Sequence, residues 1–315
     1  MGFFDNIVGK KDKNYWLNLG NSYLKNNKHD EALESFKEIL KQDQNDFHAW
    51  KNIGDVYYKI FQFDLALSAY DKALEANPKN IEILLNKADI QINKKNFTES
   101  LEISNRILDI FPDNQRCLFL KARALFSLNQ KEEAVNILYK ILKINPKLPD
   151  VWQELAFELT ILERDEEAYD AYKQLLKISQ NDTHIWHIWK DFASFLELSE
   201  NYEEAIFALE KAMELSGFGT DLEMISMRAD LYEKIDRKDV SKPLFEWILS
   251  TCNHLLLNDG VYTIKKENGI SSIFCPINDA LEYKAQALLG LKKFDSALQT
   301  CEKILKNNPK SYNGL

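Results

Sequence analysis

Residues 47–80 read FHAWKNIGDVYYKIFQFDLALSAYDKALEANPKN, and their apolar residues recur at the spacing of an α-helix. Trp50 and Gly54 share one helical face, a turn is expected near Gln62, and Pro78 ends a second helical segment. The stretch therefore predicts a helix, a turn and a second helix within 34 residues.

This pattern recurs along the chain, and positions 8 and 20 of every copy hold Gly, Ala or Ser. The copies start at Lys13, Phe47, Ile81, Gln115, Pro149, Trp186, Leu222 and Asn278. Small residues at both positions let the paired helices approach closely, so that Trp50, Tyr57 and Tyr70 fill the space between them. One pair cannot bury its own apolar face, so it needs neighbours on both sides.

The order of large, small and aromatic residues in each copy resembles the tetratricopeptide repeat. The resemblance implies an all-α fold, a right-handed α-solenoid of about eight helix-turn-helix repeats. The expected segments are an N-terminal cap (1–12), repeats 1–5 (13–182), repeats 6 and 7 (186–255), an insertion (256–277) and repeat 8 (278–311). Position 18 is where each second helix should begin, and carboxylates there predict helix capping. These residues are Asp30, Asp64, Glu132, Glu166, Glu203, Asp239 and Asp295, with Thr98 in the third repeat.

The insertion at residues 256–277 contains two β-rich runs around Asn268 and Gly269, which predict a small β-hairpin. The expected pairs are Ile264 with Ile273 and Tyr262 with Cys275, on one apolar face turned toward the neighbouring helices. Long insertions in repeat arrays often carry function, and the alternative is a tolerated surface loop.

Composition favours one elongated helical array in the cytoplasm. Hydrophobic residues make up 45% of the chain, which has only 10 Gly and 7 Pro. No run approaches the roughly 18–20 apolar residues of a membrane span, and the N-terminus lacks the order of a signal peptide. Four cysteines without a CxxC pair predict neither a zinc site nor a disulfide framework, and no cofactor is expected. The net charge of −9 disfavours binding to nucleic acid.

Both ends of the array carry apolar residues. One apolar face near the N-terminus is formed by Phe3, Phe4, Ile7 and Val8. It is expected to cap the first repeat, and the alternative is a short helix that docks on a membrane surface or a partner. No polar helix follows the last repeat, so Leu298, Ile304 and Leu305 are expected to be partly exposed, covered by the hairpin or by a second chain in a homodimer.

The resemblance implies that the first helix of each repeat lines the concave face and contacts ligands through positions 2, 5, 6, 9 and 13. In the N-terminal half these positions predict a basic, amide-rich peptide-binding groove of Asn21, Lys51, Asn52, Asn86, Arg116 and Arg123. In the C-terminal half they predict an acidic groove that includes Glu154, Asp191, Asp230 and Glu282.

The basic set resembles the two-carboxylate clamp of chaperone-docking members of the family. Lys51, Asn86 and Arg116 match that clamp in kind, whereas Asp55 and Leu120 replace an Asn and an Arg. Asp55 would repel a carboxylate, which argues against a true clamp. The groove could bind an acidic peptide, bind another partner, or be only a solvated surface. The nearby aromatic residues Tyr58, Phe119 and Phe126 fit either peptide anchors or core.

The sequence thus predicts a non-catalytic scaffold or adaptor that binds an extended peptide or a helix of a partner protein. One alternative is co-chaperone-like binding of acidic C-terminal tails. The other is a metal-binding or enzyme-associated module that uses His184, His187 and Asp191, which are spaced to share one helix face. No fourth ligand or general base is evident beside them.

Overall fold

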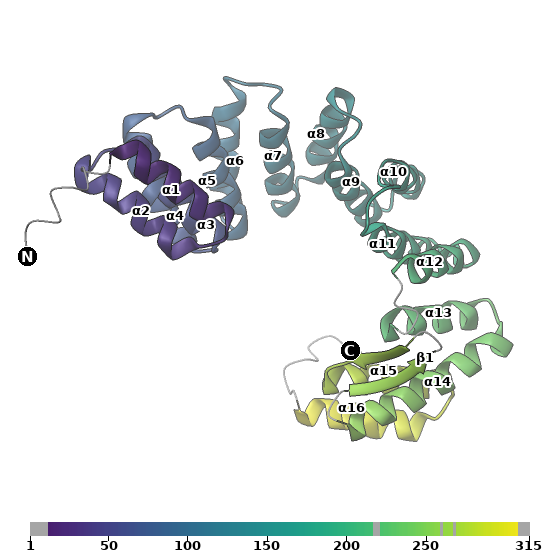
Figure 1. Cartoon of the computed structure of the whole chain (residues 1–315). Coiled ribbons are helices and arrows are strands. Elements are labelled where there is room, and N and C mark those ends of the chain that lie inside the picture. The colour runs from purple at the N-terminus through teal and green to yellow at the C-terminus, as the bar shows by residue number, and fades with distance from the viewer. Residues whose placement is uncertain (1–11, 217–220, 259–260, 267–268, 308–315) are drawn as a thin grey trace, which may run out of the picture. The chain divides into compact units, whose positions relative to one another are not determined.

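A computed structural model describes residues 12–216, 221–258, 261–266 and 269–307. Within these ranges the chain forms sixteen α-helices and two β-strands (Figure 1). The chain divides into two compact units, residues 1–151 and 152–315, which we describe one at a time. The expected N-terminal cap lies almost wholly outside the described residues.

The N-terminal unit consists of helix pairs that follow one another along the chain. Its helices are α1 (Lys13–Lys25), α2 (His29–Gln42), α3 (Phe47–Lys59), α4 (Phe63–Ala76), α5 (Ile81–Asn93), α6 (Phe97–Leu108), α7 (Gln115–Ser127) and α8 (Lys131–Ile144). Each of these helices packs on the next, and α5 also contacts both α3 and α7. The first helices of consecutive pairs therefore share one layer, as in an α-solenoid.

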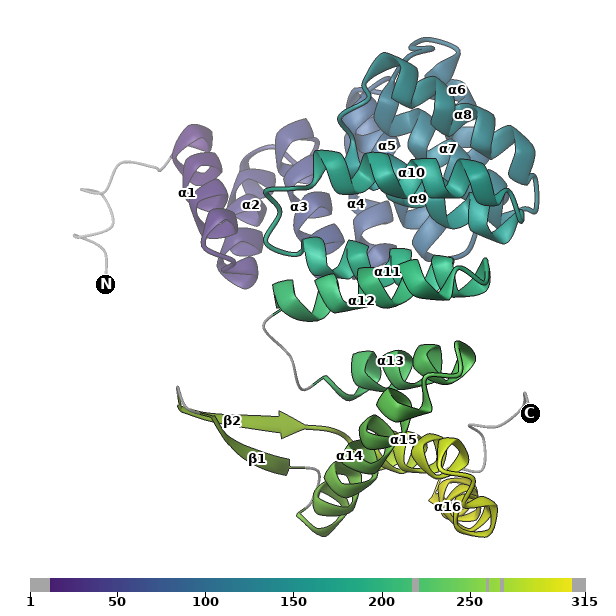
Figure 2. The same cartoon turned by 90° about the vertical axis from the view of Figure 1, so that its right-hand side faces the viewer.

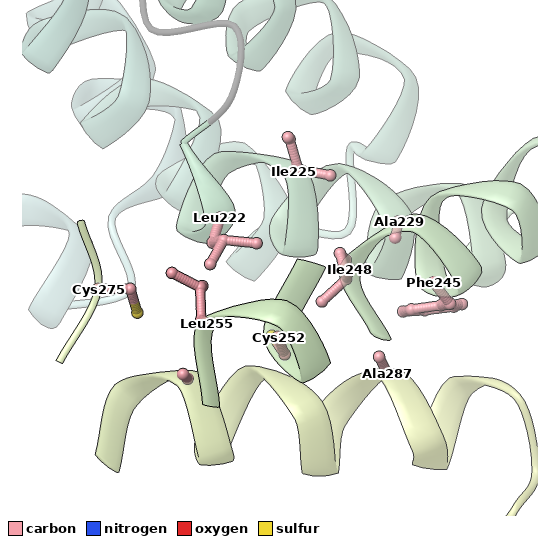
Figure 3. Packing of buried hydrophobic residues seen from close by; sticks show 10 residues of the cluster. Leu222, Ile225, Ala229, Phe245, Ile248, Cys252, Leu255, Cys275 and Ala287 are labelled. Carbon is pink, nitrogen blue, oxygen red and sulfur yellow. The ribbon is translucent and has the colours of Figure 1, made fainter. Parts of the chain in front are cut away.

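The C-terminal unit continues the same scheme after α9 (Pro149–Ile161), a helix that contains the division between the units. Its other helices are α10 (Asp165–Ile178), α11 (Ile185–Leu198), α12 (Tyr202–Ser216), α13 (Leu222–Lys234), α14 (Lys238–Leu257), α15 (Ile277–Gly290) and α16 (Phe294–Asn307). Figure 3 shows one of its cores, in which Phe245, Ile248 and Cys252 of α14 lie between α13 and α15.

Glycine at position 8 is required by the packing between paired helices. A Cβ atom on Gly20 would lie 2.5 Å from the ring of Phe36, and one on Gly54 would lie 2.5 Å from the ring of Tyr70. Both rings are fully buried. The expectation that small residues admit large ones across the pair is confirmed at these two sites.

Helix capping occurs at different residues from those predicted. The N-cap side chains of five first helices accept a backbone N–H three residues later, at 2.7–3.1 Å. These caps are Asp12, Asp46, Asn80, Asn114 and Asp221. The second helices begin one residue before position 18, and α2, α4, α6, α8, α10 and α14 have no side-chain cap. The prediction that position 18 caps them is therefore wrong; its carboxylates lie in the first turn, where they favour the helix dipole.

The turn inside every repeat has the same backbone. Position 15 has a positive φ of 55–62° in all eight repeats, at Asn27, Phe61, Lys95, Asn129, Glu163, Glu200, Asp236 and Lys292. The next residue donates its N–H to a carbonyl five residues back, as Gln62 does to Tyr57 at 2.9 Å. This is the Schellman arrangement, which satisfies the last carbonyls of the first helix.

The insertion contains β1 (Val261–Lys266) and β2 (Gly269–Phe274), which pair antiparallel beside α14 (Figure 2). Their register differs from the predicted one by two residues, since Tyr262 pairs with Ile273 and Ile264 pairs with Ser271. Both predicted pairs, Ile264 with Ile273 and Tyr262 with Cys275, are therefore wrong; Cys275 follows the end of β2 and is buried in the core around α14. The side chains of residues 261–274, and hence the expected apolar face, lie outside the description.

The outer side of the last helix is partly apolar. Leu298 and Leu305 of α16 are exposed, as predicted, whereas Ile304 is 1% exposed, so that its predicted exposure is wrong. Ile304 is placed on the inner face of α16. Among the residues that the structure describes, none of the helices has the length and apolar character needed to cross a membrane.

Candidate functional site

The face formed by α3, α5 and α7 carries most of the predicted basic groove. The Nζ atom of Lys51 lies 2.9 Å from an Asp55 oxygen and 3.0 Å from a Glu82 oxygen. Burial opposes the charge of Lys51, but the hydrogen bonds and attraction from both carboxylates outweigh it and raise the pKa of the ammonium. Lys51 thus stays charged, and its charge is balanced by carboxylates of the protein itself.

Asp55 joins this ion pair to the next two repeats. The hydroxyl of Tyr70 donates to Asp55 at 2.7 Å, and the Asn86 amide donates to the Tyr70 oxygen at 2.9 Å. Arg116 then donates to the Asn86 carbonyl at 2.8 Å, and Asn86 is only 7% exposed. A chain of hydrogen bonds therefore crosses three repeats and fixes the groups that were expected to bind a ligand.

A second carboxylate engages the remaining predicted cation. Asp89 accepts a hydrogen bond from the Tyr58 hydroxyl and lies 3.7 Å from the guanidinium of Arg123. Burial and this bond to Asp89 raise the pKa of Tyr58 to about 12. Phe126 is buried, so it belongs to the core, whereas Asn21 on α1 and Asn52 on α3 are exposed and half-buried respectively.

In the C-terminal unit, residues of α9, α10 and α11 line a pocket of about 410 Å³. It is lined by Gln153, Glu154, Phe157, Thr160, Tyr172, Asp191, Ser194, Phe195 and Leu198. The rings of Tyr172 and Phe195 are stacked with centroids 5.3 Å apart, and both side chains are buried. In contrast, Phe157 is 56% exposed and Leu198 is 73% exposed. The pocket combines a buried aromatic floor with apolar walls open to solvent.

Two carboxylates line this pocket and none of its lining residues is basic. Asp191 accepts a hydrogen bond from the neutral amide of Gln153 at 3.4 Å. Although Asp191 is open at the mouth of the pocket, partial burial raises the pKa of its carboxyl group. The neighbouring Lys190 pairs with Glu223 at 2.6 Å, so that its charge is already engaged.

Asp230 of α13 is a further member of the predicted acidic groove. Burial, followed by repulsion from Glu197 and Glu233, outweighs the attraction of Lys234 and raises its pKa to about 6. Its carboxylate accepts a hydrogen bond from the Gln286 amide at 3.3 Å. Glu282, the remaining predicted acidic residue, is exposed on α15.

The predicted metal ligands His184, His187 and Asp191 do not form a ligand set. His184 precedes α11, and the centroids of the two imidazole rings are 6.4 Å apart. In the described parts of the chain, no three His, Cys, Asp or Glu residues are grouped to hold a metal ion. The described residues therefore contain no metal site that would support the metal-binding alternative.

Models of the tetratricopeptide repeat match residues 17–80, 190–217 and 279–311. The chain belongs to the tetratricopeptide-repeat family. Residues 59–141 of this tetratricopeptide-repeat protein also match a model described as anaphase-promoting complex, cyclosome, subunit 3. No curated protein sequence matches the chain.

Solved structures of similar fold include a tetratricopeptide repeat protein from Parabacteroides merdae, with 19% identity, a TM-score of 0.58 and coverage of 73% of this chain and 90% of that one. PilF of Pseudomonas aeruginosa has 18% identity and a TM-score of 0.55, with 69% and 96% covered. MamA of Desulfovibrio magneticus has 17% identity and a TM-score of 0.51, with 55% and 99% covered. These likenesses show the tetratricopeptide-repeat fold alone.

Sequence reasoning missed the apolar half of the pocket. Phe157 and Leu198 hold positions 9 and 13 of repeats 5 and 6, which the family resemblance assigns to the ligand-contacting face. Large apolar residues at ligand-contacting positions of a tetratricopeptide repeat are the signal in the sequence that indicates this half of the pocket.

Proposed function

We propose that this protein is a non-catalytic adaptor that binds a segment of a partner protein on the first-helix face of its C-terminal unit. The observation that supports this function is the pocket between α9 and α11, where Phe157 and Leu198 are largely exposed. Apolar side chains gathered around a hollow lose contact with water when a ligand covers them. Fully burying one such side chain contributes about 1.5–3 kcal/mol.

The α3, α5 and α7 face is a weaker candidate for binding. An acidic peptide there would have to displace Asp55 and Glu82 from Lys51, and Asp89 from Arg123. Each displaced carboxylate would then repel the incoming one. We therefore assign these residues to the stability of the N-terminal unit.

The test is a selection of phage-displayed random dodecapeptides on the immobilised full-length chain. Selected peptides are synthesised, and their affinities are measured by fluorescence anisotropy for wild type, Leu198→Glu and Leu65→Glu. Leu65 is the matched control because it is 49% exposed but belongs to α4 of the N-terminal unit and does not line the pocket. Circular dichroism verifies that both variants are folded.

We expect Leu198→Glu to weaken binding at least about tenfold, a loss of about 1.4 kcal/mol or more. Leu65→Glu should leave the affinity unchanged. Equal affinities for wild type and Leu198→Glu, or a selection with no peptide enriched, would overturn the proposal.

A further inference from the structure

The pocket between α9 and α11 also indicates the chemistry of its ligand. We infer that it takes a segment in which an apolar side chain stands beside a lysine or arginine, whose cation lies against Asp191. This inference rests on the proposed function and adds a charge requirement to it.

The apolar part of the segment has a defined seat. Tyr172 and Phe195 form a floor that is at most 5% exposed, and Phe157 and Leu198 stand beside it. A hollow of about 410 Å³ accepts a large aliphatic or aromatic side chain and part of its backbone. Contact with both the floor and the walls removes apolar area from water on both partners.

The polar part of the pocket favours a cation. Asp191 stands at the mouth, and the neutral amide of Gln153 donates a hydrogen bond to it at 3.4 Å, a long contact. Lys190, whose charge acts on Asp191, is paired with Glu223 at 2.6 Å, and His187 lies one turn before Asp191 on the same helix. A guanidinium or ammonium from the ligand would give Asp191 a charge-assisted hydrogen bond that is stronger than the amide contact.

The negative charge continues along the same face of the unit. Lys234 engages Glu197 at 2.8 Å, while Asp230 accepts from the neutral amide of Gln286. A second basic residue of the segment would find Asp230 as its partner. Anionic segments are excluded by the same carboxylates, since like charges at close range are mutually repelled.

The experiment repeats the dodecapeptide selection on the full-length Asp191→Asn/Asp230→Asn variant, with Glu302→Gln as control. Glu302 is an exposed carboxylate on the second helix of the last repeat. The peptides selected on wild type should contain Lys or Arg next to an apolar residue, and those selected on the double variant should not. Replacing that Arg by citrulline keeps the shape of the side chain and removes its charge.

We expect the citrulline peptide to bind wild type at least about tenfold more weakly than the arginine peptide. The double variant should bind the two peptides with equal affinity. Affinity for wild type should also fall as salt is raised. The charge requirement would be overturned if the selected peptides lacked basic residues, or if citrulline weakened binding equally for wild type and the double variant. The Leu198→Glu variant tests the pocket independently of this result. If Leu198→Glu also has no effect, the adaptor function itself fails.

Discussion

Asp55 in the N-terminal unit and Asp230 in the C-terminal unit both occupy position 9 of a repeat, yet their surroundings differ. Asp55 receives a hydrogen bond from Tyr70 and pairs with Lys51. In the repeat of Asp230, the residues at the positions of Lys51 and Tyr70 are Ser226 and Phe245. Two changes remove an ammonium and a hydroxyl and leave the carboxylate in place.

The same repeat position thus has two roles. With both donors present, the carboxylate links three helices and is part of the structure. With both donors absent, burial raises the pKa of Asp230 to about 6, so that its charged form is unfavourable in the folded protein. Groups that reduce stability in this way are common where a ligand supplies the missing partner.

Gly54→Ala should have the largest effect on stability. The new methyl group would meet the Tyr70 ring at 2.5 Å, and that ring is held by Asp55 and Asn86 through its hydroxyl. We expect a loss of about 3 kcal/mol from the free energy of unfolding. Urea titration by circular dichroism measures it, and hydrogen exchange of α3 and α4 localises it.

Gly290→Ala is the matched variant in the C-terminal unit, where the methyl group would meet the Phe245 ring at 2.4 Å. Phe245 has no hydroxyl to hold its ring in place, so the ring can turn and the loss should be smaller. A larger loss for Gly290→Ala than for Gly54→Ala would contradict the idea that the hydrogen bonds fix Tyr70.

Tyr70→Phe makes repeat 2 more like repeat 7. It leaves Asp55 and Asn86 without their shared hydroxyl in a mostly buried setting, which should cost about 2 kcal/mol of unfolding free energy. Thermal unfolding of the full chain checks this, with Tyr57→Phe on the same unit as control. A change no greater than that of Tyr57→Phe would show that the network contributes little stability.

Asp230→Asn should have the smallest effect and the opposite sign. The pKa of Asp230 rises from 3.8 to about 6 on folding, so the folded chain binds the proton more tightly than the unfolded chain. The ionised carboxylate therefore lowers stability fully above pH 6, and this penalty disappears below about pH 4. Asp230→Asn should add about 1–2 kcal/mol at pH 7.5 and almost nothing at pH 4.

Urea titrations at the two pH values test this prediction, and Asp55→Asn provides the contrast. That variant breaks the pair with Lys51 and should destabilise the protein at pH 7.5. If Asp230→Asn destabilises the protein equally, the two carboxylates have the same role and the comparison fails.

Local periodicity was enough to predict the helices. First helices begin at Lys13, Phe47, Ile81, Gln115 and Leu222, where the copies were expected to start, because each start combines a polar cap with an apolar face. The hairpin register was not predictable in the same way. Asn268 and Gly269 indicated the turn, but the burial of Cys275 in the helical core, a tertiary contact, accompanies a register shifted by two residues.

The candidate site was predicted only in part. The spacing of Lys51 and Asp55 by four residues was a visible sign of pairing on one helix face. The bonds of Tyr70 to Asp55 and of Asn86 to Tyr70 join residues of different helices, which no local pattern reveals. The pocket beside Phe157 likewise depends on how three helices meet.

The left-handed residue in each repeat turn has a consequence for engineering. None of the eight is a glycine, and an L-residue in this conformation costs about 1–2 kcal/mol, somewhat less for asparagine. Summed over the chain, the cost is of the same order as the 5–15 kcal/mol that typically holds a domain together. None of the eight residues lines the pocket, so those outside repeats 5 and 6 form a reserve from which a more heat-resistant protein can be made while its binding face stays untouched.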